Sequence, residues 1–286
     1  VAALPAAVER SGYDRSALKT GIVHLGIGAF MRAHMAAATE AAIAAGDLYQ
    51  VNYTAPVQGQ LQGEPLALFQ ALLQAVSRHG KGRVAVEDAE RKPLSYGNLV
   101  LGALVLGRKL AGYTQPKEHI GVLLPNVQAL AVTLFGLSAF GRVPALLNFT
   151  AGVKNLRAAG ELAELKTIVT SRRFVDQAKL EDELEALGEN RRIVYLEDVR
   201  KEITSLDKAL GALSSLVPGF VHRVYAAAPD EAAVILFTSG TEGKPKGVVL
   251  SHANLVSNAR QIFALAAGFL SERDIVMNPL PAFHSF

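Results

Sequence analysis

The sequence predicts an α/β protein whose layered, mostly parallel sheet is covered by flanking helices. From about residue 83 onward, short runs rich in Val, Ile and Leu alternate with longer stretches of helical period. These runs lack polar alternation, which is typical of strands buried on both faces. The helical stretches between them supply the crossovers that parallel strands require. Because 50% of the 286 residues are apolar, the chain can build a substantial core.

The predicted strands follow one another at short intervals. They span residues 84–88, 119–125, 143–149, 166–171, 192–198, 232–239 and 247–251. Helices are predicted over residues 66–80, 97–112, 127–140, 174–187 and 253–266. Ser95, Asn126 and Ser251 precede helices and belong to the residue types that cap helix N-termini. The helix over 174–187 is expected to carry an apolar face made of Phe174, Ala178, Leu180 and Leu184.

Neither a membrane span nor an oxidising compartment is predicted. The apolar stretch 120–140 contains Pro125, Asn126 and Gln128, so a strand, a turn and a buried helix explain it better than a span of about 20 unbroken apolar residues. The first residues lack the charge and apolar pattern of a signal peptide. Cysteine is absent, which excludes a disulfide framework and cysteine-ligated zinc. We expect a cytoplasmic protein.

The charge pattern argues against a nucleic-acid partner. A formal charge of +3 arises from 29 basic and 26 acidic residues spread along the chain. The pairs Arg172–Arg173 and Arg191–Arg192 have no aromatic residues interleaved, so solvated turns are expected there. No metal site is predicted on the protein, and peripheral membrane association is the one membrane contact left open.

The first sixty residues differ from the rest. Residues 21–34, GIVHLGIGAFMRAH, read as a short strand, a glycine turn and the start of an alanine-rich helix. Residues 48–65 are rich in Gln, Gly and Pro and read as linker. We therefore expect an isolated β-α unit at 1–50, a linker at 51–62 and the main α/β domain at 63–286.

A donor-rich loop, FTSGTEGKPKG at 237–247, lies between two predicted strands. Its hydroxyls, glycine amides and lysine charges suit a polyphosphate. The residues expected to contact phosphate are Thr238, Ser239, Gly240, Thr241, Gly243, Lys244, Lys246 and Gly247. Pro245 fixes one φ between the lysines, which limits the entropy lost on binding. Because proline follows Gly243-Lys244 where a Walker A loop has Ser or Thr, a P-loop NTPase is excluded.

FTSGTEGKPKGVVLSHANL resembles the signature loop of the adenylate-forming superfamily, which includes acyl-CoA and acyl-carrier-protein synthetases, luciferases and nonribosomal peptide adenylation domains. Residues 120–152 resemble the first strands of the family's large domain, and NPLPAFHSF at 278–286 resembles a later motif beside its acyl pocket. In all, about residues 62–286 are covered. Residues 87–112 and LNFTAGVKNL look most like the synthetase half of bacterial acyl-carrier-protein synthetase/phospholipid acyltransferases.

The resemblance implies ATP-dependent activation of a long-chain fatty acid as an acyl-adenylate, followed by transfer to acyl carrier protein or CoA. ATP and Mg²⁺ are the implied cofactors, and Lys246 and His284 match positions in the catalytic set. Adenine-binding, ribose-binding and C-terminal lysine motifs have no counterpart up to Phe286. We therefore expect a fragment of the large domain that binds nucleotide weakly, does not complete adenylation alone, and tends to aggregate through an unpaired sheet edge.

A second resemblance covers residues 5–48, which look like the opening of the mannitol dehydrogenase and fructuronate reductase group. Gly26, Gly28, Phe30 and Arg32 match its dinucleotide-binding turn, so NAD is an alternative cofactor. The third glycine of GxGxxG falls at Met31, which weakens this signal. Alternatives to the ligase are therefore a fragment of an NAD-dependent polyol or sugar-acid oxidoreductase, or a non-catalytic chimera joined near residues 48–60.

Overall fold

The computed structural model describes residues 66–88, 91–217, 224–225, 227–239, 245–265, 274–276, 278 and 280–284. The described residues from 66 to 265, together with 281–284, belong to one compact unit. The predicted β-α unit at 1–50 and the linker at 51–62 lie outside the described residues, and so do the loop residues 240–244.

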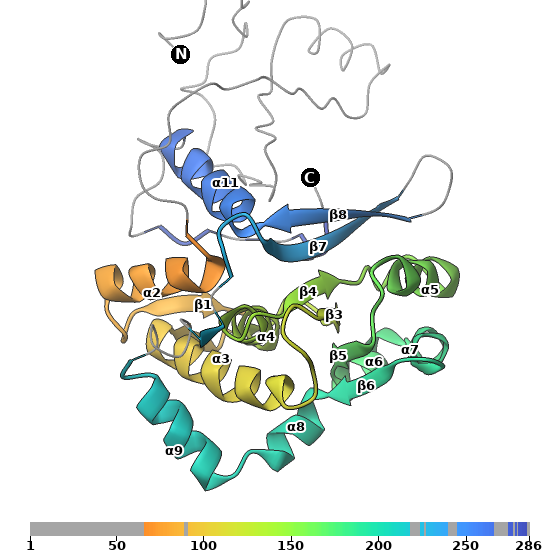
Figure 1. Cartoon of the computed structure of the whole chain (residues 1–286), viewed down its shortest axis with the longest axis horizontal. Helices are drawn as coiled ribbons and strands as arrows, with labels where there is room; N and C mark the ends of the chain where they lie inside the picture. Colours follow the sequence, from red (N-terminus) through yellow and green to blue (C-terminus); the bar gives the residue numbers. More distant parts are fainter. Residues whose placement is uncertain are drawn as a thin grey trace, which may run out of the picture. The chain divides into compact units, whose positions relative to one another are not determined.

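A six-stranded sheet with the order β6-β5-β3-β4-β7-β8 forms the centre of this unit (Figure 1). Neighbouring strands from β6 to β7 are parallel, and only β8 pairs antiparallel with its neighbour. The bounds are β3 His119–Leu123, β4 Val143–Leu146, β5 Thr167–Thr170, β6 Arg192–Tyr195, β7 Ala232–Ser239 and β8 Pro245–Ser251. The predicted mostly parallel α/β fold is therefore confirmed.

Helices connect the parallel strands and cover both faces of the sheet (Figure 1). They are α2 Leu68–His79, α3 Tyr96–Ala111, α4 Gln128–Ala139, α5 Val153–Leu162, α6 Arg172–Ala178, α7 Glu181–Gly188, α8 Leu196–Glu202, α9 Ser205–Ser214 and α11 His252–Leu265. A small antiparallel pair, β1 Val84–Glu87 and β2 Pro93–Ser95, precedes α3. The strand β2 was not predicted, because it has only three residues and opens with proline.

Successive side chains of each strand point to opposite faces of the sheet, so the apolar side chains of the strands are divided between two hydrophobic cores, called here the α5 core and the α4 core. The α5 core contains Ile168 and Ile235 together with residues of α5, α6 and α7. The α4 core contains the neighbouring strand residues Val169 and Leu236 together with residues of α3, α4 and α8. The strands β4 and β5 are buried at every position, as predicted from the lack of polar alternation along the strands.

Helices α3 and α4 approach closely because glycines face each other between them. A Cβ placed on Gly107 would lie 2.5 Å from the carbonyl oxygen of Gly136 and 2.6 Å from the ring of Phe140. A Cβ on Gly136 would lie 2.9 Å from the carbonyl oxygen of Ala103. Glycine is thus required at this crossing so that the two backbones can touch.

Two of the predicted helix caps are confirmed. The Ser95 Oγ accepts a hydrogen bond from the Asn98 N–H at 3.3 Å, and the Ser251 Oγ accepts one from the Asn254 N–H at 3.1 Å. The third prediction is wrong, because α4 begins after Val127 without a side-chain cap. Asn126 instead accepts a hydrogen bond from a segment far along the chain.

The helix predicted over 174–187 is broken into α6 and α7. Lys179 between them has a φ of 54°, in the left-handed region, which ends α6. At 100° per residue, one continuous helix would place Leu180 about 120° and Leu184 about 80° around the axis from Phe174. The expected continuous helix was therefore wrong, but Phe174, Leu180 and Leu184 all enter the α5 core, and Ala178 packs against it.

Strand β8 also differs from the prediction, which treated it as buried. Val248 is 37% exposed and Val249 is 59% exposed. The exposure follows from the position of β8 in the sheet. β8 is the last strand in the order, and none of the described strands pairs with its outer side. The apolar run was correctly predicted to form a strand, but an edge strand keeps part of its surface in solvent.

The apolar stretch 120–140 forms β3, a turn and α4, as predicted. Among the residues that the model describes, no helix is long and apolar enough to cross a membrane.

Candidate nucleotide site

The candidate site begins at the ends of β7 and β8, which bring both sides of the predicted phosphate loop together. Ser239 pairs with Pro245, Thr238 with Lys246, and Phe237 with Gly247. The residues between Ser239 and Pro245 therefore connect paired strands at the carboxyl end of β7. In an open parallel sheet, this is the edge where ligands bind.

Thr238 and Lys246 point to the same face of the hairpin because opposite residues of an antiparallel pair share a face. Their Cβ atoms are then about 5 Å apart. Thr238 is half-buried and Lys246 is exposed, so this face carries a hydroxyl and an exposed ammonium group on paired residues. Leu236, two residues earlier on the same face, belongs to the α4 core. The pair thus lies on the α4 side of the sheet.

A short segment at 281–284 reaches the same side. Phe283 is 5% exposed and packs in the α4 core together with Leu236. The Ala282 N–H donates to the Asn126 Oδ1 at 3.0 Å, which ties the segment to the turn after β3. The His284 N–H donates to the Pro281 carbonyl oxygen at 3.0 Å, and the His284 ring stacks on Phe283 at 5.1 Å. His284 is thereby held near the carboxyl ends of the strands.

Phe149 joins this segment to the other face of the sheet. Its ring centroid lies 5.0 Å from Phe283 and 5.0 Å from Phe174, with edge-to-face geometry in both contacts. Phe149 follows β4, so these rings form an aromatic wall along the carboxyl ends of β4 and β5. An apolar wall next to a hydroxyl and an ammonium group suits a ligand that is part apolar and part anionic.

The described structure thus locates only part of the predicted site. Thr238, Lys246, Gly247 and the backbone of Ser239 lie on the paired strands, and His284 lies on the segment tied to Asn126. The other predicted residues fall outside the described residues: Gly240, Thr241, Gly243, Lys244, Gly26, Gly28, Phe30 and Arg32. Sequence reasoning did not select Asn126 or Phe149 for the site. The asparagine after a strand was a usable signal, but it was assigned to a helix cap.

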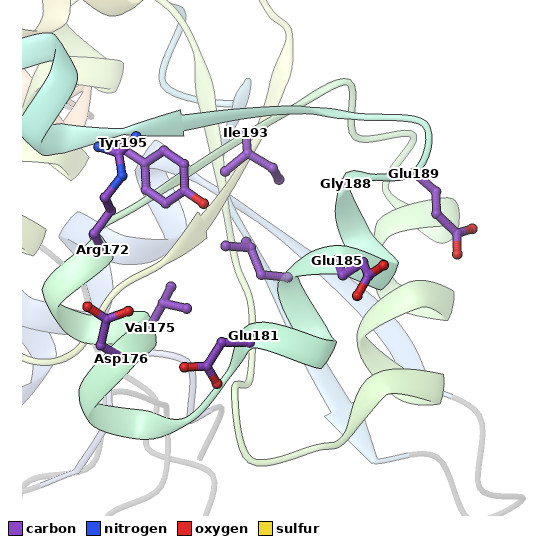
Figure 2. Close-up of a pocket in the computed structure, with 10 residues that line it drawn as sticks. Arg172, Val175, Asp176, Glu181, Glu185, Gly188, Glu189, Ile193 and Tyr195 are labelled. Carbon is purple, nitrogen blue, oxygen red and sulfur yellow. The ribbon is translucent and has the colours of Figure 1, made fainter.

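A separate pocket of about 620 Å³ lies beside β6, between α6 and α7 (Figure 2). Asp176, Glu181, Glu185 and Glu189 bring carboxylates to its lining. Its one lining cation, Arg172, lies over the Tyr195 ring at 3.9 Å and pairs with Asp198 at 2.6 Å. Because like charges repel, this pocket is unsuited to a polyphosphate. It is not the nucleotide site.

No group of three or more His, Cys, Asp or Glu residues that could hold a metal ion occurs among the described residues.

Comparisons with known proteins show the family of the chain and its fold. A family model described as "AMP-binding enzyme" matches residues 72–286. The acyl-CoA ligase sidI of Beauveria bassiana is 27% identical over 175 residues, covering 59% of this chain and 30% of that protein. The 4-coumarate–CoA ligase 1 of Petroselinum crispum is 27% identical over 232 residues, covering 77% of this chain and 40% of that protein. This chain therefore spans well under half the length of these relatives.

Among solved structures, o-succinylbenzoate CoA synthetase (MenE) from Bacillus subtilis, in complex with the acyl-adenylate intermediate OSB-AMP, matches with a TM-score of 0.57. The match covers 76% of this chain and 50% of that chain at 18% identity. At that identity the likeness shows the fold.

Fold and site together define an α/β domain of the adenylate-forming type. The chain belongs to the AMP-binding enzyme family. The resemblance of residues 5–48 to polyol dehydrogenases lies outside both the described residues and the family match, and it stays a prediction.

Proposed function

We propose that this chain provides the phosphate-binding part of an ATP-dependent ligase that activates a carboxylic acid as an acyl-adenylate and passes the acyl group to a thiol. One observation carries the proposal: Thr238 and Lys246 lie opposite each other at the mouth of the β7–β8 hairpin. The family match over residues 72–286 supports it.

The residues present fit the triphosphate of ATP. Lys246 offers an exposed ammonium group, and Thr238 beside it offers a hydroxyl donor. Charge-assisted hydrogen bonds from such groups to phosphate oxygens are stronger than those between neutral partners. Thr241, Lys244 and the glycine amides of the loop are proposed to add further donors. Since the described residues hold no acidic cluster for a metal, Mg²⁺ is proposed to enter bound to the nucleotide.

Positioning carries the chemistry in this proposal. ATP supplies the leaving pyrophosphate, and the protein holds the α-phosphate close to the attacking carboxylate. Lys246 offsets negative charge on the phosphates, which favours the transition state more than the ground state when charge moves onto the leaving group. His284 and the aromatic wall of Phe149 and Phe283 are proposed to bound the acyl side of the site.

A long-chain fatty acid is the proposed acid, and acyl carrier protein or CoA the proposed acceptor. This follows the resemblance of residues 62–286 to acyl-carrier-protein synthetases. The named relatives act on other acids or name no acid, among them a 4-coumarate and a sulfoacetate ligase. Cytoplasmic localisation is proposed because the chain has no cysteine, which fits a reducing compartment.

Thermal unfolding of the chain in rising Mg-ATP tests the proposal. A saturable rise in the melting temperature is expected, equivalent to about 2.7 kcal/mol at a hundredfold excess over Kd. Lys246→Gln is expected to weaken the apparent affinity about tenfold, since a charge-assisted bond contributes about 1.5–3 kcal/mol. Lys208→Gln, at an exposed position of α9, serves as the matched control and is expected to leave the affinity unchanged.

Titration with NAD tests the alternative function, that of an oxidoreductase. Stabilisation by NAD without any stabilisation by Mg-ATP would favour the oxidoreductase reading and overturn the ligase proposal. Equal Mg-ATP affinity for Lys246→Gln and the unaltered chain would remove Lys246 from the proposed phosphate site.

A further inference from the structure

A second cavity, of about 250 Å³, lies at the amino ends of the parallel strands, whereas the β7–β8 loop lies at their carboxyl ends. It is lined by residues that open β3, β4 and β7 and by the first residue of α11. Ala232 in its lining and Ser239 at the loop are the two ends of β7, so the two places are about 23 Å apart along the strand. The proposed nucleotide site does not use this cavity.

Ser138 supplies the first sign of a ligand. The residue is 2% exposed and lines the cavity, and its Oγ has no hydrogen-bond partner among the residues that the model describes. Serine in a helix usually bonds to the carbonyl oxygen four residues earlier when no other acceptor is near. An unpaired buried hydroxyl is rare in folded proteins, and an ordered water or a ligand in the cavity would supply its partner.

Arg142 supplies a buried positive charge, and none of the described carboxylates forms an ion pair with it. It is 5% exposed, and its guanidinium donates to the Thr114 Oγ1 at 3.1 Å, the Thr114 carbonyl oxygen at 2.6 Å, the Ala111 carbonyl oxygen at 3.2 Å and the Phe140 carbonyl oxygen. All of these acceptors are neutral. Burial lowers the pKa of Arg142, against the opposing effects of Tyr225 and Glu118 at longer range.

An ion pair closes the rim of the cavity. Lys117 Nζ lies 2.5 Å from Glu231 Oε1, and the other carboxylate oxygen of Glu231 accepts from the Ala228 N–H at 2.9 Å. The hydrogen bond from Lys117 lowers the pKa of Glu231. Because Glu231 is held in this way, the lining carries two positive charges, on Lys117 and Arg142, and one negative charge, on Glu231. The lining is therefore net positive.

Two imidazoles complete the lining. His252 Nδ1 accepts from the Leu68 N–H at 3.1 Å, so Nδ1 carries no proton and Nε2 is the protonated nitrogen. His119 Nδ1 lies 2.9 Å from the Ala163 carbonyl oxygen, so Nδ1 is the donor there. Both rings are fixed by backbone partners, which makes the cavity a preformed polar space.

We propose that this cavity binds a small oxyanion, either a carboxylate or inorganic phosphate. An oxyanion would accept a hydrogen bond from the unpaired Ser138 hydroxyl and lie near the guanidinium of Arg142, whose hydrogen-bond acceptors among the described residues are all neutral. The volume leaves room for such an anion together with water. The inference is independent of the proposed ligase function, since it concerns residues at the other edge of the sheet.

The test measures thermal unfolding in sodium phosphate and in sodium acetate, against sodium chloride at equal ionic strength. A saturable rise in melting temperature is expected with at least one of the two anions, and the anion with the larger effect identifies the source. Ser138→Ala is expected to weaken the apparent affinity about tenfold. In chloride the same variant is expected to melt no lower than the unaltered chain, because the lost hydroxyl had no partner. Ser215→Ala, which removes a hydroxyl that donates to the Ala212 carbonyl oxygen at the C-terminal end of α9, is the matched control.

Phosphate could also bind at the β7–β8 loop, so the titration is repeated in the Lys246→Gln background. Anion stabilisation that persists there and is lost with Ser138→Ala supports the cavity. Stabilisation that is lost with Lys246→Gln and retained with Ser138→Ala assigns the anion to the loop and overturns the inference, while leaving the proposed function intact. Absence of any saturable effect means that water alone fills the cavity, which also overturns it.

Discussion

The side-chain oxygen of Asn126 accepts a hydrogen bond from the Ala282 N–H at 3.0 Å, joining segments that are 156 residues apart in the chain. Asn126 follows β3, in the centre of the sheet, whereas Ala282 precedes the buried Phe283 and the candidate residue His284. One amide therefore positions the segment that carries His284 against the carboxyl edge of the sheet.

Asn126→Ala is expected to lower the free energy of unfolding by about 1 kcal/mol, the usual net contribution of one hydrogen bond. Urea unfolding measures the change. Asn126→Asp keeps an oxygen acceptor of the same length and is the matched control, expected to retain most of the stability near pH 7. Equal losses for the two variants would show that the acceptor oxygen does not hold the segment.

Gly107→Ala is expected to destabilise the domain by about 1–3 kcal/mol, because the new methyl group would meet the Gly136 carbonyl oxygen and the Phe140 ring. Gly188→Ala is the control, since a Cβ there has Ile193 at 3.4 Å as its nearest neighbour and fits without strain. Alanine at that helical position is expected to change stability little or to raise it by about 0.5 kcal/mol. Chemical denaturation of both variants checks the contrast.

Stability is expected to fall in acid through Asp207. Hydrogen bonds from Lys109 and then from Thr204 lower the pKa of Asp207 to about 2. Because the folded pKa lies below the unfolded value near 3.9, this carboxylate stabilises the fold above about pH 4 and loses that effect as the pH falls towards 2. Asp207→Asn is expected to melt lower than the unaltered chain at pH 6. The difference is expected to shrink steadily between pH 4 and pH 2, and a difference independent of pH would exclude this ion pair as its cause.

Val249→Lys is expected to reduce self-association of the chain at high concentration. Val249 is 59% exposed on β8, at the end of the described strand order, and a lysine on an edge strand disfavours edge-to-edge pairing. Light scattering over a concentration series measures the effect. Leu206→Lys, at an exposed position of α9, is the control for the added charge alone. Val234→Lys cannot serve as the control, because it would place the charge in the α4 core.

The strands of the large sheet were predictable because each depends on a local run rich in Val, Ile and Leu, such as the largely buried His119–Leu123 segment. Their order was not, because it depends on contacts far apart in sequence. β7 inserts beside β4, with Ala145 opposite Ile235, although two other strands and several helices come between them in the chain. Local periodicity contains no information about such a pairing.

The two errors near the site have a similar origin. A cap and a long-range acceptor require the same residue type, so Asn126 could be assigned correctly only once Ala282 was placed beside it. Residues 174–187 were read as one continuous helix because their apolar residues fall near one face, whereas Lys179 adopts a left-handed backbone conformation that ends α6. The loop FTSGTEGKPKG was identified from sequence because its chemistry lies in consecutive residues.

Phe149 packs against both the α5 core and the α4 core, just beyond the carboxyl end of β4. Around that edge the sheet no longer separates its two faces, and one ring contacts Phe174 from one side and Phe283 from the other. Changes made on the two sides of the sheet are therefore not independent of each other. Truncating Phe174 and Phe283 together should produce an effect that differs from the sum of the separate effects, with Phe149 as the shared neighbour that transmits the difference.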